Sequence, residues 1–232
     1  DILINMLKKK VIVLTGGGTA GHVYPALAVA ENLTDFEIHY LGGKGIEKDI
    51  LSKFPKIIYH EISGVKLERK LTPKNFLIPF KLLKAVKQAK AELKKINPDI
   101  IFSKGGFVAV PVAIAGKKLH IPIISHESDL SLGLANKIIL KFCNIMCTSF
   151  EKTGKNHKKC CFSGQPIRNK IFQGKKLNLD FDNSKPTILI LGGSLGSQFL
   201  NDIIFKNLDK LTEKYNILHI CGKNNYQKNV HK

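Results

Sequence analysis

The sequence predicts an α/β protein: a domain built on a parallel β-sheet with helices on both faces, followed by the start of a second domain of the same kind. Short runs of β-branched residues alternate with longer segments of helical periodicity, which is the pattern of repeated βαβ units. Three of the expected strands end in glycine-rich turns that open helices, as in open sheets that bind ligands at their carboxyl edge. Of the 232 residues, 44% are hydrophobic and 24% are charged, which is typical of a folded globular protein.

The elements of the first domain follow one another in a strict alternation. The expected strands are residues 11–15, 37–41, 57–62, 99–103, 122–126 and 145–148. The expected helices are residues 23–33, 46–53, 76–96, 108–119 and 132–142. Because each strand is followed by a helix, we expect the strands to run parallel and the helices to form the crossovers.

A change in composition divides the chain. Periodicity is lost and polar residues accumulate between Gly164 and Pro186, so we expect an interdomain linker there. The first domain, the linker and the second domain are expected at residues 6–163, 164–186 and 187–232. The second domain begins with a strand, a helix and a strand, at residues 187–191, 198–211 and 216–221. These elements cannot bury their own apolar faces, so we expect this domain to be incomplete in the given sequence.

The charge balance is strongly basic. The sequence has 37 Lys and Arg residues against 18 Asp and Glu, a formal net charge of +19, which indicates a polyanionic partner unless it reflects only a lysine-rich genome. Nucleic acid is the weaker choice of partner, because no aromatic-rich platform or recognition helix accompanies the charge. No stretch is long and apolar enough to span a membrane and no secretory signal is present, so we expect a cytoplasmic protein. The five cysteines lack zinc-ligand spacing, and we expect neither a metal nor a cofactor.

Three glycine-rich turns are candidates for phosphate binding, at residues 16–22, 103–107 and 192–197. Glycine lets successive backbone N–H groups converge, and the start of the following helix adds a partial positive charge. A plain tight turn remains the alternative for each loop. Gly16, Gly18 and Gly21 also fit the G-x-G-x-x-G pattern of dinucleotide-binding proteins, but the second strand ends without the acidic residue that this pattern needs. A Walker P-loop is excluded because no Gly-Lys-Ser/Thr follows the first glycines.

Two side chains at these strand ends are candidates for acid–base chemistry. His22 lies at or just before the start of the first helix, and Glu127 ends the fifth strand at the same edge of the sheet. A helix N-terminus lowers the pKa of an imidazole, and the neutral imidazole is the form that accepts a proton. The alternatives are that His22 only caps or packs, and that Glu127 only stabilises the helix after it. Asp180 and Asp182 form a D-x-D pattern, but they lie in the polar linker and we expect them to be exposed to solvent.

A basic amphipathic stretch spans residues 76–96. Apolar residues recur there at helical spacing, lysines fill much of the remainder, and additional apolar residues surround the first half. We predict a patch that binds an anionic membrane surface, at about 1 kcal/mol per nearby basic residue. The alternative is a buried crossover helix with a solvated lysine face. The predicted patch consists of Phe76, Leu77, Phe80, Lys81, Lys84 and Lys87.

Five motifs in a fixed order carry a resemblance to a known family. They are residues 16–28, 103–107, 126–129 with 133–137, 164–168 and 192–197. Together they resemble the MurG family of glycosyltransferases, and the likeness runs from about Lys10 to the end of the sequence. The resemblance implies a GT-B-like fold of two Rossmann-like domains, in which the first holds a lipid-linked acceptor at the membrane and the second holds most of a nucleotide sugar.

The resemblance also implies an activity. Proteins of this family move N-acetylglucosamine from UDP-N-acetylglucosamine to lipid I, giving lipid II for peptidoglycan at the cytoplasmic face of the bacterial cell membrane. A hydroxyl of the muramyl sugar attacks the anomeric carbon with inversion, and UDP leaves. Family members continue well beyond residue 232, so we expect the isolated chain to be inactive. The alternatives from other classes are a non-catalytic basic module that binds membrane or phosphorylated ligands and, last, a nicotinamide-dependent reductase.

Individual residues are assigned by the same resemblance. His22 is the candidate base, with Glu127 as the second candidate in the same region. The acceptor diphosphate would be faced by Gly17, Gly18, Gly105 and Gly106. The donor would be contacted by Thr19, Ala20, Gly21, Asp129, Arg168 and Ser194. Ser128 and Asp129 stand where many family members carry Gln-Asn, so this sequence departs from the family at the position assigned to contact the sugar.

Overall fold

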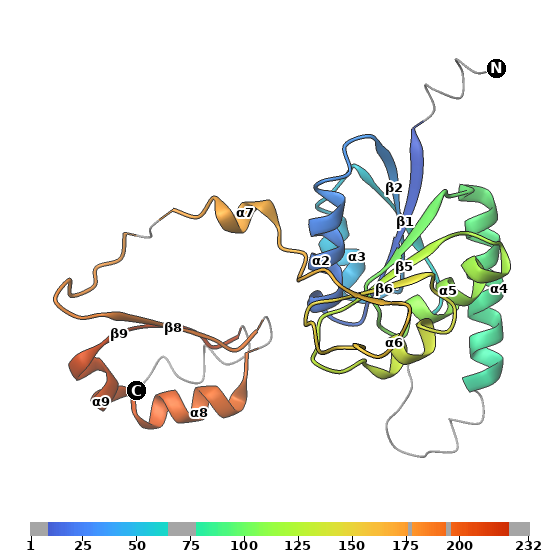
Figure 1. Ribbon diagram of the computed structural model, residues 1–232. Helices are drawn as coiled ribbons and strands as arrows, with labels where there is room; N and C mark the ends of the chain where they lie inside the picture. Colours follow the sequence, from blue (N-terminus) through green and yellow to red (C-terminus); the bar gives the residue numbers. More distant parts are fainter. Residues whose placement is uncertain (1–8, 65–77, 176–177, 194–195, 223–232) are drawn as a thin grey trace. The chain divides into compact units, whose positions relative to one another are not determined.

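The computed structural model describes residues 9–64, 78–175, 178–193 and 196–222 (Figure 1). The chain divides into two compact units, residues 1–174 and 175–232, and each unit is described by itself. The division falls within the polar segment that follows Gly164. This segment also contains a helix of one turn, α7 (Asn169–Phe172), which is too short to show a periodicity in the sequence.

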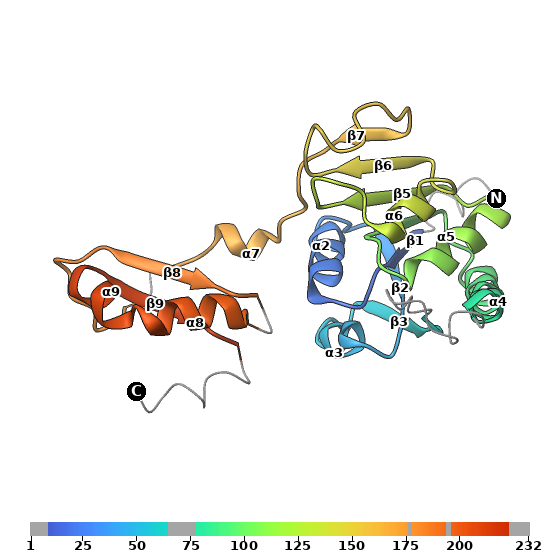
Figure 2. The ribbon, with the colours of Figure 1, turned by 90° about the horizontal axis from the view of Figure 1, so that it is seen from below.

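The first unit is organised around one parallel sheet, which has seven strands among the described residues (Figure 2). The strand order is β3-β2-β1-β4-β5-β6-β7, so the chain runs from β1 to one edge, returns to β4 beside β1, and continues to the other edge. Every neighbouring pair is parallel. The strands are β1 (Lys10–Thr15), β2 (Phe36–Gly42), β3 (Ile57–Glu61), β4 (Ile100–Ser103), β5 (Ile123–Glu127), β6 (Ile145–Thr148) and β7 (Cys160–Phe162).

Helices cover both faces of this sheet (Figure 2). Two of them pack on one face and contact each other, α2 (Ala20–Ala30) and α3 (Ile46–Leu51). The other face is covered by α4 (Ile78–Ile96), α5 (Ala109–Lys118) and α6 (Leu134–Ile139). This two-sided arrangement is the predicted α/β architecture, and the prediction is confirmed.

The central strands contribute to both cores, because successive side chains of a strand point to opposite faces. Ile12 and Leu14 of β1 belong to the core under α2 and α3, whereas Val13 between them belongs to the core under α4 and α5. All three are at most 5% exposed. Burial on both faces explains why these strands are continuous apolar runs in the sequence rather than alternating ones.

Several element boundaries differ from the sequence prediction by one to three residues, and one strand was not predicted. α2 begins at Ala20, three residues before the predicted start at residue 23, because Thr19 is the last residue with extended backbone angles (φ −148°, ψ 156°). β7 was not predicted. It is a strand of three residues that is ordered by pairing with β6, and so short a run has no recognisable periodicity.

The two halves of α4 have different environments. Its buried residues are Ala85, Val86, Ala89 and Leu93, so burial begins only near the middle of the helix. In the first half, Phe80 is 71% exposed and Leu83 is 57% exposed. The second half therefore packs as a crossover helix, whereas the first half presents apolar side chains to solvent.

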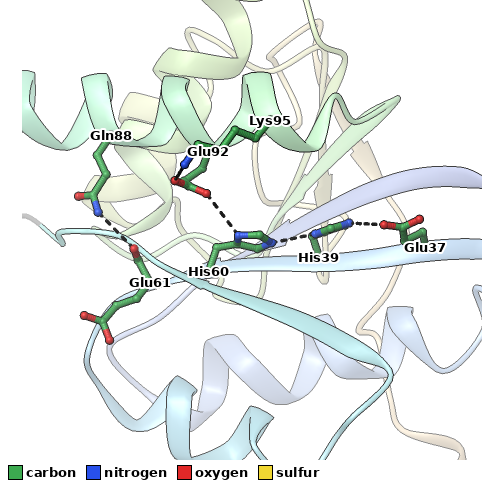
Figure 3. A network of polar contacts seen from close by, with 7 residues as sticks. All are labelled: Glu37, His39, His60, Glu61, Gln88, Glu92 and Lys95. Carbon is green, nitrogen blue, oxygen red and sulfur yellow. Dashed lines mark hydrogen bonds and ion pairs between the residues drawn. The ribbon is translucent and has the colours of Figure 1, made fainter.

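A chain of polar contacts joins α4 to β2 and β3 (Figure 3). The His39 ring lies between the Glu37 carboxylate and the ring of His60. Its Nε2 is 2.8 Å from Glu37 Oε1, and its Nδ1 is 2.8 Å from His60 Nε2. His60 Nδ1 lies 3.4 Å from Glu92 Oε2 on α4, and Glu92 Oε1 accepts a hydrogen bond from Lys95 Nζ at 2.9 Å. These contacts fasten the second half of α4 to the sheet.

The second unit is smaller and less buried. Its elements are β8 (Thr187–Leu191), α8 (Gln198–Lys206), α9 (Leu208–Lys214) and β9 (Asn216–Ile220), and the two strands pair in parallel. The sequence predicts one helix over residues 198–211. The structure instead has a break at Asn207, whose side-chain amide donates a hydrogen bond to the carbonyl of Ile203. Leu189 and Leu191 of β8 are 54% and 58% exposed.

Candidate functional site

Four loops meet at the carboxyl edge of the first sheet. They follow β2, β1, β4 and β5, which are neighbours in the sheet. The direction of winding changes between β1 and β4, and open α/β sheets bind ligands at such a point. The first two predicted glycine loops lie together there: Gly106 has a φ of +81°, and a Cβ on it would lie 2.5 Å from the carbonyl oxygen of Gly17. The two loops therefore pack backbone against backbone, which only glycine permits.

The loop after β2 brings a buried carboxylate to this edge. Glu47, in the first turn of α3, is 1% exposed and accepts hydrogen bonds from the backbone N–H groups of Gly43 at 2.9 Å and Gly18 at 3.4 Å. A Cβ on Gly17 would lie 2.6 Å from Glu47 Oε1. The carboxylate thus holds the loop after β1 against the loop after β2. Because its oxygens are buried and hydrogen-bonded, it is not placed to hold a ribose as the dinucleotide-binding alternative would require.

His22 is the third residue of α2, inside the first turn of the helix. Its Nδ1 lies 2.9 Å from Thr19 Oγ1. Burial and then the positive charge of Lys104 hold the pKa of His22 below its ordinary value, although the carboxylates of the neighbouring loops oppose this shift. The predicted direction of the shift is confirmed, but its largest cause is burial rather than the end of the helix.

Glu127 accepts hydrogen bonds on both of its oxygens. Oε1 accepts from the backbone N–H groups of Ser128 at 2.8 Å and Asp129 at 3.1 Å. Oε2 accepts from the N–H of Gly133 at 2.8 Å and from the side-chain amide of Asn136 at 3.0 Å. Burial raises the pKa of Glu127, but the hydrogen bonds more than offset this, and the pKa lies below its ordinary value. Glu127 therefore organises the loop after β5, and the hydrogen bonds to both of its oxygens weaken it as a base.

Arg168 lies against the helix that carries His22. Its guanidinium carbon is 4.3 Å from the centre of the Tyr24 ring on α2, a cation–π contact. The backbone N–H of Asn169 donates to Glu31 Oε2 at the end of the same helix, at 2.9 Å. These two contacts place the predicted donor contact Arg168 beside α2.

The other predicted donor contacts are distributed as follows. Thr19 precedes α2 directly, and Ala20 and Gly21 are the first two residues of the helix. Asp129 is an exposed residue of the loop after β5. Ser194 lies outside the described residues. Within the first unit, the structure thus gathers the predicted residues around the loops that follow β1, β4 and β5.

The predicted membrane patch lies elsewhere, in the helix layer on the other face of the sheet from α2. Phe76 and Leu77 fall outside the described residues. The other four members are all exposed in the first half of α4: Phe80, Lys81, Lys84 and Lys87. α4 therefore has an exposed basic and apolar segment, as a membrane patch would need. Its second half is packed, as in a buried crossover helix. No helix within the described ranges is long and apolar enough to cross a membrane.

No metal centre is formed by the part of the chain that the structure describes, where no group of three or more His, Cys, Asp or Glu side chains is placed to hold an ion. Asp180 and Asp182 of the D-x-D pattern are exposed, as expected. The Asp182 carboxylate accepts hydrogen bonds from the backbone N–H and the hydroxyl of Ser184, at 2.9 and 2.6 Å. Asp182 therefore stabilises a turn.

Among the buried polar residues at the sheet edge, Glu47, Lys104 and Asn136 were not chosen from the sequence as site residues. The Asn136 amide donates to the carbonyl of His126 at 3.2 Å as well as to Glu127, and so holds the end of β5. A signal for Glu47 was present, because Gly42, Gly43 and Gly45 form a fourth glycine-rich turn at the end of the second strand. Nothing local distinguishes Lys104 from the many exposed lysines of this sequence.

Two family models match the chain. Residues 12–148 match the glycosyltransferase family 28 N-terminal domain, and residues 187–232 match the glycosyltransferase family 28 C-terminal domain. Together they cover the larger part of both structural units.

Individual proteins are similar over nearly the whole chain. One relative is the UDP-N-acetylglucosamine--N-acetylmuramyl-(pentapeptide) pyrophosphoryl-undecaprenol N-acetylglucosamine transferase of Clostridium tetani. It is 48% identical over an alignment that covers 96% of this chain and 64% of that protein. The protein of the same name from Clostridium botulinum (strain Alaska E43 / Type E3) is 50% identical, over 97% of this chain and 65% of that protein. The crystal structure of Acinetobacter baumannii MurG has a TM-score of 0.69 and 30% identity, over 95% of this chain and 61% of that chain. This chain thus spans less than two thirds of the length of these relatives.

Proposed function

The chain belongs to glycosyltransferase family 28, and we propose that it forms the acceptor-binding domain and part of the donor-binding domain of an inverting glycosyltransferase. The reaction moves N-acetylglucosamine from UDP-N-acetylglucosamine to lipid I, the undecaprenyl-diphosphate-linked muramoyl peptide, and gives lipid II for peptidoglycan. The observation that carries this proposal is that relatives named for this transfer are 48–50% identical over 96–97% of the chain.

The proposal assigns contacts with both substrates to residues of the first unit. In the first unit, the paired glycine loops face the acceptor diphosphate through Gly17, Gly18, Gly105 and Gly106. The close packing of these loops brings their backbones to the point between β1 and β4 where open α/β sheets bind ligands. In the same unit, we assign the contacts with the donor to Thr19, Ala20, Gly21, Asp129 and Arg168.

His22 is the proposed general base. Burial and Lys104 favour its neutral imidazole. When the Nδ1–H donates to Thr19 Oγ1, the Nε2 atom retains a lone pair that accepts a proton. This Nε2 takes the proton from the attacking muramyl hydroxyl as the new bond forms at the anomeric carbon. The bond between that carbon and the UDP oxygen breaks, UDP leaves with the bonding electrons, and the configuration is inverted.

The test is a transfer assay with labelled UDP-N-acetylglucosamine and a lipid I analogue. It compares this chain alone with the chain joined to the C-terminal third of the Clostridium tetani relative. We expect turnover only from the extended protein. In that protein, His22→Asn should lower kcat by about 10²- to 10⁴-fold with little change in binding, because it removes the base. His120→Asn is the matched control, since His120 is exposed at the end of α5 and far in the fold from the glycine loops.

The outcomes separate the alternatives. A folded extended protein that transfers no sugar would favour the non-catalytic basic module. Equal activity in His22→Asn and His120→Asn would leave the transferase proposal standing but remove His22 as its base. Robust transfer by the isolated chain would contradict the expectation that this part of the enzyme is inactive by itself.

We further propose that the first half of α4 contacts the cytoplasmic face of the membrane, so that the protein is peripheral. The support is the exposed Phe80 and Leu83 beside Lys81, Lys84 and Lys87. The triple variant that replaces these three lysines by Gln should bind vesicles of phosphatidylglycerol and phosphatidylcholine about 100-fold more weakly, at about 1 kcal/mol per lysine. A control triple variant replaces three exposed lysines outside α4, Lys53, Lys56 and Lys117. Equal losses in the two triple variants in a sedimentation assay would show that only the total charge matters.

A further inference from the structure

Lys104 is a buried cation that takes no part in the proton transfer of the proposed mechanism. It follows β4 directly and is only 2% exposed. Its backbone N–H donates to the carbonyl of Thr15 at 2.8 Å, and a Cβ on Gly16 would lie 3.1 Å from the Cβ of Lys104. A Cβ on Gly16 would also lie 3.3 Å from the carbonyl oxygen of His22. Gly16 therefore lies beside both the side chain of Lys104 and the backbone of His22.

The ammonium group begins a chain of hydrogen bonds across the sheet edge. Lys104 Nζ donates to Ser128 Oγ at 2.7 Å, and the Ser128 hydroxyl donates to Gln165 Oε1, also at 2.7 Å. Ser149 Oγ donates to the same Gln165 oxygen at 2.5 Å. Ser128, Ser149 and Gln165 lie in the loops after β5, β6 and β7, so one lysine is connected to three further loops.

The charges around His22 are otherwise acidic. Glu47, Glu127 and Asp129 all act on the imidazole in the direction that favours its protonation. Lys104 acts in the opposite direction, and its effect on the His22 imidazole is larger than that of each of these carboxylates. An ammonium ion near an imidazole disfavours a second positive charge, and the effect is larger in a partly buried site than in water.

We propose that Lys104 is a positioning residue of this site: its ammonium group connects the loops after β4, β5 and β7, and its positive charge opposes protonation of the His22 imidazole. The catalytic importance of this effect rests on the proposed role of His22 as the base. The electrostatic effect itself belongs to the folded chain and does not depend on turnover. Burial of Lys104 lowers its own pKa, and the carboxylates of Glu127 and Asp129 oppose that shift, so the lysine and these acids stabilise each other's charges.

The experiment is an NMR titration of the histidine rings in this chain, with the His22 signal identified by its loss in His22→Asn. Lys104→Met removes the charge and the hydrogen bond. Ser128→Ala removes the hydrogen bond acceptor but retains the charge. We expect the His22 titration to move to higher pH in Lys104→Met and to remain at the wild-type pH in Ser128→Ala. Asp129→Asn removes an exposed negative charge and should move the titration to lower pH.

Two results would overturn the proposal. One is a His22 titration that is the same in Lys104→Met as in wild type. The other is an equal upward shift in Lys104→Met and Ser128→Ala, which would mean that loop packing rather than charge sets the titration. If Lys104→Met does not fold, Lys104→Gln replaces it, because Gln is neutral and retains an N–H donor for Ser128.

The assay of the extended protein gives a separate readout. The acidic limb of the kcat/KM profile against pH should move to higher pH in Lys104→Met, in the same direction as the His22 titration. An NMR shift without any transferase activity in the extended wild-type protein would contradict the proposed function and leave the electrostatic role of Lys104 intact. A shifted NMR titration with an unshifted acidic limb would overturn the link between Lys104 and catalysis.

Discussion

Glu47 and Glu127 are the buried carboxylates at the carboxyl edge of the sheet in the described part of the chain. Each accepts backbone N–H groups from a loop: Glu47 from Gly18 and Gly43, and Glu127 from the residues that follow it. A buried carboxylate with such donors is stabilised, whereas the same donors without it would lose their partners. At the scale of single residues, the loops after β1, β2 and β5 therefore depend on carboxylates that accept their backbone N–H groups.

Replacement of Glu47 by Gln tests this dependence. An amide offers one acceptor oxygen in place of two, so one of the N–H groups of Gly18 and Gly43 loses its partner. We expect the free energy of unfolding to fall by about 1–3 kcal/mol, measured by urea titration followed by circular dichroism. Asp49→Asn, an exposed position on the same helix, should change it by less than about 0.5 kcal/mol. Equal effects in the two variants would argue against the structural role of Glu47.

At the scale of elements, α4 combines a packed half and an exposed half. The packed half is held to β2 and β3 through His60, which faces His39 on one side and Glu92 on the other (Figure 3). Burial and then the proximity of His39 hold the pKa of His60 below its ordinary value, with Lys95 acting in the same direction and Glu92 opposing. The folded state therefore favours the neutral ring.

This pKa shift predicts how α4 responds to acid. The unfolded chain binds a proton on His60 more readily than the folded chain does. The contribution of neutral His60 to the free energy of unfolding is therefore present above its unfolded pKa and is lost as the pH falls through its folded pKa. Lowering the pH from about 7.5 to about 5.5 should therefore increase amide hydrogen exchange in α4, after correction for intrinsic rates. The increase should be smaller in His60→Gln than in wild type. In His157→Gln it should equal the wild-type increase, because His157 is exposed. An identical response in all three proteins would exclude His60 as the cause.

At the scale of the whole molecule, the two units differ in how far they bury their strands. Val13 and Leu14 of β1 are 0% exposed, because helices cover both faces of the seven-stranded sheet. Leu189 and Leu191 of β8 are more than half exposed, and the sheet of the second unit has two strands in its described part. Sheets of two strands are marginal by themselves.

This difference predicts two levels of local stability in the chain. Amide protons of β8 and β9 should exchange with solvent faster than those of β1 and β4, because opening them exposes less newly hydrated apolar surface. Hydrogen exchange followed by mass spectrometry of peptic peptides measures both sets in one sample. The chain extended by the C-terminal third of the Clostridium tetani relative should protect β8 and β9 further. Equal protection of β1 and β8 in the chain alone would contradict this account.

The class of fold and the position of most elements could be predicted from the sequence, because periodicity and glycine-rich turns are local properties. The short elements were not predicted: β7 and α7 have three and four residues, too few for a periodic pattern to be recognised. The start of α2 was placed three residues late for a related reason. Ala20 and the glycines around it show no helical spacing of apolar residues. Only the extended backbone of Thr19 marks the start of the helix.

The sequence by itself determined the α/β class, the glycine loops at the carboxyl ends of strands and, through resemblance, His22 as the candidate base. The tertiary structure decided which side chains surround that base. Glu47 bonds to Gly18 across 29 residues, and Lys104 bonds to Ser128 across 24. A glutamate on a short helix and one lysine among many carry no local sign that they are buried. Their burial follows from the strand order, which places β1 beside β4 and closes the loops over them.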